Sequence, residues 1–410
     1  MNHRLKLPAL FLAGTFLVAA CGTAGGSGST SSTDSPSAAT ASAVVVDSKA
    51  ADLTTKLNVL LGEHLILASK ATGAALGGRN AEFAAYGGLL NKNGTDIGDM
   101  IGAAYGSAAK DQFNAIWSAH NGFFVDYTTG VATKNQAKMD AAVTNLTTVY
   151  LPQFSKLISD ATGLPLATVT DLTKTHILTT KDIVDAQGKK DWPAAYAAIR
   201  KAYAHMQMIG NPLGAAIAAK KPDLFPGDAK NKGVIFRVAL NGLLQEHLYL
   251  ASDATDAALG GRSDEFAAAG KALNDNGTDL GAAIGSLYGD AAGTQFNAIW
   301  SAHNGFFVDY TTGVATKDQA KMDTAVKNLT TVYLPQFSDF IAGATGLPKS
   351  AVSDLTKTHV LTTKDVVDAQ GAKDVAGAAD KDRLAAQHME MIGDPLAKAI
   401  VAKLPAKFQG

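Results

Sequence analysis

The stretch QFNAIWSAHNGFFVDYTTGVATK occurs twice in the chain, at residues 112–134 and 295–317, without a single change. Its apolar residues recur at steps of three and four, the spacing of one face of an α-helix. The offset between the copies, 295 minus 112, is 183 residues, and Glu63-His64 matches Glu246-His247 in the same register. A fixed offset over such a distance predicts two tandem copies of one domain.

The repeat divides the chain into four parts. Residues 1–20 are predicted to be a lipoprotein signal peptide, and residues 21–50 a cysteine followed by a flexible tether of Gly, Ser, Thr and Ala. The first repeat then covers 51–227 and the second covers 228–410. Each repeat is long enough to bury a core of its own. The formal net charge is −1 and no basic face is indicated, so nucleic acid is not an expected partner.

The leader indicates where the protein resides. Arg4 and Lys6 give it a positive start, and the apolar stretch 7–20 is too short to span a membrane as a helix. The letters VAAC at 18–21 resemble the bacterial lipobox, whose cysteine is acylated and becomes the new N-terminus. Cys21 is the only cysteine, so the rest of the chain contains no disulfide. We therefore expect an extracytoplasmic protein anchored by lipid to the bacterial cell membrane or envelope; the alternative is an ordinary secretory signal with an incidental cysteine.

Each repeat is predicted to be an all-α bundle of four long helices plus one or two short ones. Apolar residues keep helical spacing throughout, and no segment alternates for long as a strand does. Asn93-Gly94 is expected to break the second helix, and Asn211-Pro212 to stop or kink the last one.

Histidine is the chemical signal of the repeat. Apart from one in the leader, the histidines form four matched pairs: His64/His247, His120/His303, His176/His359 and His205/His388. Within a repeat the four lie on four different predicted helices, most of them on the apolar face. Imidazoles that converge from several helices are how bundles build metal sites. Glu63 and Glu246 adjoin the first histidine and could bind the metal or orient a ligand.

Imidazole suits copper, iron, zinc and nickel. Copper or iron is our first expectation, and zinc is possible. The alternative is that these histidines are structural, since most buried histidines are simply hydrogen-bonded core residues. The sequence contains no P-loop, dinucleotide fingerprint, nucleophile elbow or zinc-protease helix, so no complete catalytic motif identifies an enzyme.

A resemblance adds to this interpretation. The order Glu63-His64-Leu65, then NGTDIG at 93–98 with Tyr105-Gly106, then Phe113, Trp117 and His120 looks like a family of bacterial envelope proteins with repeated helical bundles, often labelled copper-amine-oxidase-like. The resemblance implies an envelope location and a helical fold. The chain lacks the Asn-Tyr-Asp/Glu and His-x-His motifs of true copper amine oxidases, so amine oxidation is not predicted. Haemerythrin-like and ferritin-like bundles are similar in architecture alone.

Two functions follow as hypotheses. The first is a lipid-anchored tandem bundle that binds a transition metal through histidines in each core, for sequestration, sensing or delivery. The second is a non-catalytic envelope scaffold that binds another protein through its helical faces. Convergence of the histidines in the fold would favour the first.

Overall fold

The computed structural model describes residues 44–409, so Cys21, the signal peptide and most of the tether lie outside the described residues. Within this range every regular element is helical and there is no strand, which confirms the all-α class. The first repeat contains α1 (Lys49–Leu76), α2 (Asn80–Tyr105), α3 (Ser107–Ala132), α4 (Gln136–Asn145), η1 (Leu146–Tyr150), α5 (Leu151–Thr162), α6 (Leu166–Gly188) and α7 (Trp192–Lys220).

The second repeat reproduces this order helix by helix. It contains α8 (Lys232–Leu259), α9 (Ser263–Tyr288), α10 (Asp290–Thr316), α11 (Gln319–Asn328), η2 (Leu329–Tyr333), α12 (Leu334–Thr345), α13 (Lys349–Gly371) and α14 (Val375–Lys403), followed by the short η3 (Pro405–Lys407). Side-chain caps start several of these helices: Ser48 accepts a hydrogen bond from the Ala51 amide before α1, and Asn231 accepts one from Val234 before α8.

The elements α4, η1 and α5 follow one another without a break and form one continuous helix. The middle turn is a π-turn, in which the Leu151 amide donates to the Leu146 carbonyl. Its cause is Pro152 in the following turn, which has no amide hydrogen and crowds the carbonyl four residues before it. The extra residue per turn rotates the helix and turns Tyr150 into the core, where it is fully buried.

The predicted break at Asn93-Gly94 is wrong, because α2 runs through it without interruption. The Asn93 side chain is buried and donates to the Leu60 carbonyl of α1 at 2.9 Å. A Cβ at Gly94 would lie 2.9 Å from Cδ1 of Trp117. The pair therefore marks a close crossing between helices. The last helix, α7, does not stop at Asn211-Pro212 either; it continues to Lys220 with Pro212 inside it.

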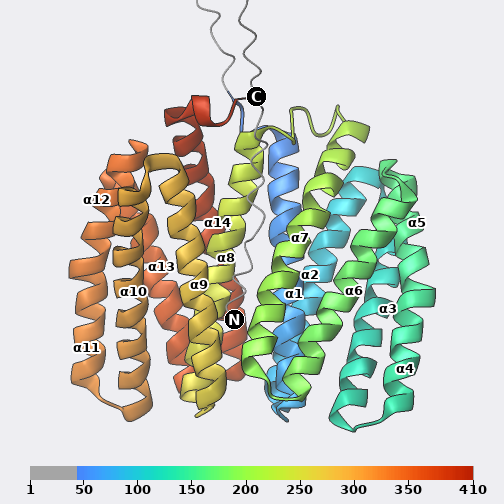
Figure 1. Cartoon of the computed structure of the whole chain (residues 1–410), viewed down its shortest axis with the longest axis horizontal. Coiled ribbons are helices and arrows are strands. Elements are labelled where there is room, and N and C mark those ends of the chain that lie inside the picture. Colours follow the sequence, from blue (N-terminus) through green and yellow to red (C-terminus); the bar gives the residue numbers. More distant parts are fainter. Residues whose placement is uncertain (1–43, 410) are drawn as a thin grey trace, which may run out of the picture. The chain divides into compact units, whose positions relative to one another are not determined.

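The two repeats pack against each other through equivalent helices, with α1 beside α8, α7 beside α9 and α14 beside α2 (Figure 1). Arg383 of the second repeat pairs with Glu63 and Asp96 of the first, and at the offset of 183 Arg200 pairs with Glu246 and Asp279. This reciprocal pairing is the pattern of a two-fold symmetric interface.

One buried ion cluster departs from that symmetry. Lys70 lies 2.6 Å from Asp253 and 3.1 Å from Asp382, across the boundary between the repeats. At the matched positions the first repeat has Ile199 in place of Asp382, and Lys70 itself corresponds to Asp253. Two copies of the first repeat would place lysine against lysine here, so the cluster favours the pairing of unlike repeats.

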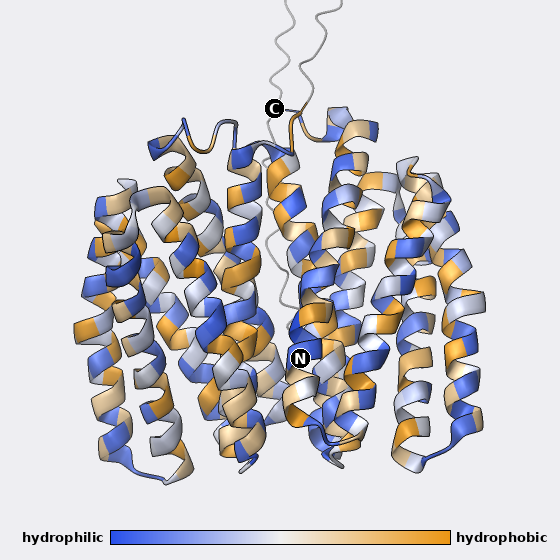
Figure 2. Ribbon diagram, turned by 180° about the vertical axis from the view of Figure 1, so that it is seen from behind, coloured by the Kyte–Doolittle hydropathy of each residue, from blue (hydrophilic) through white to orange (hydrophobic). Residues whose placement is uncertain are grey.

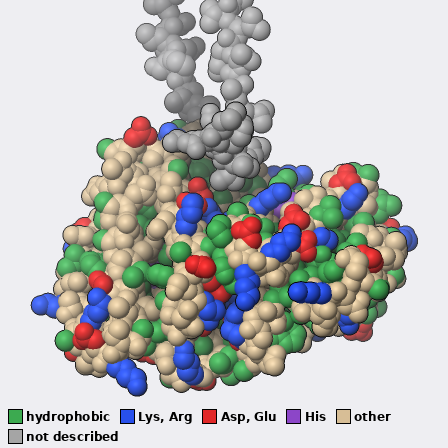
Figure 3. Space-filling model, turned by 60° about the horizontal axis from the view of Figure 1, so that its bottom comes forward, with side chains coloured by type: hydrophobic (Ala, Val, Ile, Leu, Met, Phe, Trp, Pro, Cys, Tyr) green, Lys and Arg blue, Asp and Glu red, His purple; other side chains and the backbone are tan. Residues whose placement is uncertain are grey.

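Apolar side chains of both repeats join in one main core, and hydrophobic positions are distributed along all the long helices (Figure 2). Among the described helices, α1 alone is long and apolar enough to cross a membrane, yet most of its side chains are buried within this core. On the face shown in Figure 3, Lys and Arg are interspersed with Asp and Glu.

Candidate metal centre

Three histidines of the first repeat converge in its core. His64 comes from α1, His120 from α3 and His176 from α6, and each is at least 96% buried. Their ring centroids are 5.3, 6.0 and 5.8 Å apart. One nitrogen from each ring lies within 4.8 Å of the nitrogens from the other two. The predicted convergence of these three imidazoles is therefore observed.

The second repeat builds the same group from His247 on α8, His303 on α10 and His359 on α13. Here the centroids are 5.5, 6.0 and 5.4 Å apart, and the nitrogens again lie within 4.8 Å of one another. In a tetrahedral site with bonds of about 2.1 Å, neighbouring ligand atoms are about 3.4 Å apart. Rings at this separation need to approach by little more than an ångström to bind one ion.

The hydrogen bonds of the rings fit a metal site. A neutral imidazole has one donor and one acceptor nitrogen, and both need partners when buried. Nδ1 of His120 lies 3.3 Å from the Trp117 carbonyl oxygen, a contact that leaves Nε2 for a metal. Nδ1 of His64, Nε2 of His176 and both nitrogens of His303 are buried without a protein partner. A shared metal ion would supply a partner to one nitrogen of each ring.

Burial keeps these rings neutral. It lowers the pKa of His120 from 6.5 to about 4, and burial together with the nearby His120 and His205 lowers the pKa of His176 to about 3. The pKa of His359 is likewise lowered to about 3, mainly by burial. In the remaining three rings burial also lowers the pKa well below its ordinary value: His64, His247 and His303. Neutral imidazole is the form that binds metal.

Aromatic side chains surround the group. Trp117 packs on His64 with centroids 4.5 Å apart, and Tyr150 stacks on His120 at 4.6 Å with 21° between the planes. Tyr333 repeats this on His303 at 4.5 Å and 14°. The sequence analysis did not single out these tyrosines. The available signal was the segment LTTVYLPQF, present in both copies at 146–154 and 329–337, with a proline inside a helix.

His205 and His388 do not belong to these groups of three, which corrects the expectation of four converging histidines per repeat. Nε2 of His205 lies 2.9 Å from the Leu172 carbonyl oxygen, and Nε2 of His388 lies 3.1 Å from that of Leu355. The contact uses Nε2 as a donor, and neither ring contributes a nitrogen to the groups that lie within 4.8 Å. These two histidines instead connect the last helix of each repeat to the helix before it.

Glu63 and Glu246 also lie outside the groups. The Glu63 carboxylate is bound by Arg383 at 2.9 and 3.0 Å and by the Asn93 amide at 2.8 Å. Glu246 has the matching contacts with Arg200 and Asn276. Since i and i+1 diverge by about 100° on a helix, each glutamate points to the repeat interface while the neighbouring histidine points into its own core. Their expected role as accessory ligands is not supported by this geometry.

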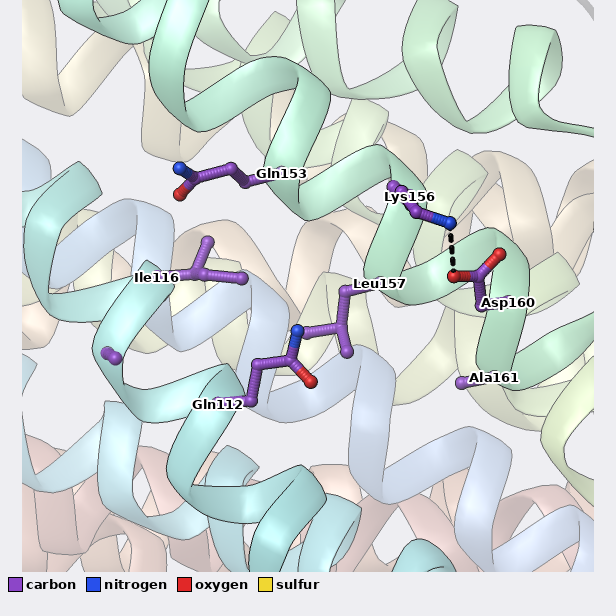
Figure 4. Close-up of a pocket in the computed structure, with 8 residues that line it drawn as sticks. Gln112, Ile116, Gln153, Lys156, Leu157, Asp160 and Ala161 are labelled. Atoms are coloured by element: carbon purple, nitrogen blue, oxygen red, sulfur yellow. Dashed lines mark hydrogen bonds and ion pairs between the residues drawn. The ribbon is translucent and has the colours of Figure 1, made fainter.

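A cavity of about 240 Å³ reaches the three-histidine group of the second repeat, with His247 and His303 in its lining. A separate apolar cavity of about 40 Å³ reaches the same group from the side of His359. An open groove of about 660 Å³ lies between α3 and α5, and no histidine lines it (Figure 4). There Lys156 and Asp160 pair at 2.8 Å, so the groove offers no unpaired charge.

Comparisons with known proteins add no assignment: no protein-family model, no curated protein and no solved structure matches this sequence. The case for a function therefore depends on the geometry of the histidines.

Proposed function

We propose that each repeat binds one transition-metal ion through its three buried histidines. The observation that carries this proposal is the convergence of three neutral imidazoles from three helices, twice, within 4.8 Å. In each set, ring nitrogens are buried without a protein partner. A structural histidine would have such a partner.

Copper is the first candidate and iron the second. No carboxylate joins the three rings, because the adjacent glutamates are bound by arginines. A bound ion therefore keeps its full charge in a buried site, and the cost of burying charge rises with its square. Reduced copper is the monovalent ion among the candidates, and imidazole suits it. Zinc also accepts three histidines, so the metal has to be identified by experiment.

The role that fits such sites is sequestration, sensing or delivery of the metal outside the cytoplasm. The VAAC sequence at 18–21 and the Gly/Ser/Thr/Ala tether support attachment to a membrane through lipidated Cys21. In this proposal the two repeats are carried near the membrane surface and bind one ion each.

Metal content tests the proposal. Protein lacking residues 1–21, expressed with copper, iron and zinc supplied, is expected to contain two ions per chain by inductively coupled plasma mass spectrometry. His120→Ala and His303→Ala should each leave one ion, and the double variant none. His205→Gln is the matched control: it keeps an N–H donor for the Leu172 carbonyl and should leave both ions in place.

Two results would contradict or change this proposal. A folded protein that contains no metal under any supply would remove this function and favour the envelope scaffold. Loss of an ion in His205→Gln would show that the site extends beyond the three histidines.

A further inference from the structure

The cavity beside the histidines of the second repeat connects them with the surface. At its inner end His247 and His303 are 1% exposed, and at its outer end Val308, Thr312 and Ala315 are exposed. Three protein ligands leave a metal with at least one open coordination position. Two of the three histidines line this cavity, so it lies directly beside the place where a shared ion would be bound.

The lining defines what the cavity can hold. Apart from the two histidines it consists of eight apolar side chains, four threonines and Asn304, with no charged residue. The threonine hydroxyls are already used as donors: Thr311 and Thr312 donate to carbonyls one turn earlier, and Thr363 donates to the His359 carbonyl. The wall therefore contains no charged side chain that would offset the desolvation of a charged ligand.

Size sets a second limit. At about 240 Å³ the cavity exceeds the roughly 150 Å³ of an engineered apolar cavity that takes up benzene. It is too small for a peptide or a cofactor the size of a nucleotide, since ligand pockets for drug-sized molecules begin at about 300 Å³.

The residues that line this cavity are the same in both repeats. All fifteen lining residues of the second repeat have the same residue at the offset of 183 in the first. On α8, by contrast, Tyr249 and Asp253 lie between lining positions and correspond to Ile66 and Lys70. Seven of the fifteen lining residues lie within the identical stretch 295–317, so the informative ones are those outside it, such as Ala251 and Ala254 on either side of the changed Asp253.

We infer that this cavity is the binding site for a small, uncharged, largely apolar molecule, no larger than a substituted benzene ring, that coordinates the metal at the open position. The inference rests on the proposed metal site and adds the class of ligand that the site accepts. It concerns binding alone and requires no chemical change in the ligand.

The test uses phenyl isocyanide, an uncharged ring with one metal-binding carbon, and carbon monoxide as the smallest probe. Both bind reduced copper and ferrous iron and give infrared stretching bands. The His120→Ala protein is used so that the second repeat alone carries metal. We expect one of either probe per metal ion. Ala251→Phe, one turn after His247 in the cavity wall, should abolish isocyanide binding and leave metal content and carbon monoxide binding unchanged.

A second variant covers the risk that a large side chain inside the bundle prevents folding. Thr312→Trp at the exposed outer end should slow the appearance of the isocyanide band, whereas the matched Thr129→Trp in the first repeat should not. Isocyanide that fails to bind a metal-loaded protein, or binds Ala251→Phe equally well, would overturn the inference and leave the metal site standing. A protein without metal would instead contradict the proposed function itself.

Discussion

Arg383 of the second repeat binds the carboxylate of Glu63 in the first, with Nε 3.0 Å from Oε1 and Nη2 2.9 Å from Oε2. Glu63 directly precedes the metal-site histidine His64 in α1. The same turn of this helix therefore contributes to both the repeat interface and the candidate metal centre. The bidentate geometry is the strong form of an ion pair, and it takes Glu63 away from the metal.

Arg383→Met is therefore expected to destabilise the protein by about 3–5 kcal/mol, because it leaves a buried carboxylate without its partner. Urea denaturation of the metal-free protein measures this. Adding Glu63→Gln to Arg383→Met should recover much of the loss, since the uncompensated charge is then gone. A loss of less than about 1 kcal/mol in the free energy of unfolding would mean that this pair contributes no more than an exposed salt bridge. Glu63→Gln alone should keep both metal ions.

Metal binding should release almost no protons. Three histidines with an ordinary pKa are half protonated at pH 6.5 and would release about 1.5 protons per ion. In this site the pKa of His120 is about 4 and that of His176 about 3, so both rings are already neutral at that pH. Isothermal titration calorimetry in buffers of different ionisation enthalpy counts the protons. Release near 1.5 would mean that the rings are solvated rather than buried.

The metal-free protein should lose stability on acidification. The six site histidines have folded pKa values below the unfolded value of 6.5, so below pH 6.5 the unfolded chain binds more protons and stability falls as pH drops toward 4. Each ring contributes about 1.4 kcal/mol per pH unit across its window. Asp253 and Asp382 act in the opposite direction, because burial raises the pKa of both carboxyls, that of Asp253 to about 6, and the folded state keeps their protons longer.

The six histidines outnumber these two carboxyls, so we expect acid unfolding between about pH 6 and 4, given a total stability of about 5–15 kcal/mol. Denaturant titrations at fixed pH with a chelator present measure the slope, and His120→Asn should make it shallower by one ring. Stability that is flat over this range would contradict the burial of the histidines.

Two glycines of α2 should respond oppositely to alanine. At Gly94 the new Cβ meets Trp117, which packs on His64, so Gly94→Ala should cost about 1–3 kcal/mol through overpacking and weaken metal binding in the first repeat. At Gly88 a Cβ meets nothing within 4 Å, and Gly88→Ala should stabilise the helix by about 0.5–1 kcal/mol. Equal effects in thermal unfolding would show that Gly94 is not a close crossing.

Periodicity and the repeat were sufficient to predict the all-α class, and the apolar face of each helix predicted that His64, His120 and His176 turn inward. The same reasoning failed for His205, because a helical wheel gives a direction and not the neighbour that the side chain reaches. The His205 side chain is hydrogen-bonded to the Leu172 carbonyl of α6. Distances between helices depend on packing that periodicity does not encode.

The interface between the repeats was not predicted for a related reason. Arg200 and Arg383 lie at matched positions within alanine-rich helices, and an arginine kept at the same position in both copies was the available signal. Its partners are distant in sequence and belong to the other copy, so no local spacing reveals them. The prediction at Asn93-Gly94 was wrong for a different reason. Asn-Gly is a common turn signal, but here the two residues allow a close contact between helices.

X-ray absorption spectroscopy of the metal-loaded protein tests the central claim most directly. The account predicts about three imidazole nitrogens per ion at about 2.0–2.1 Å, with the outer-shell scattering of imidazole rings, and the same shell in the His120→Ala and His303→Ala proteins at half the metal content. A shell made of sulfur, or of carboxylate oxygens alone, would contradict three-histidine binding in the bundle cores.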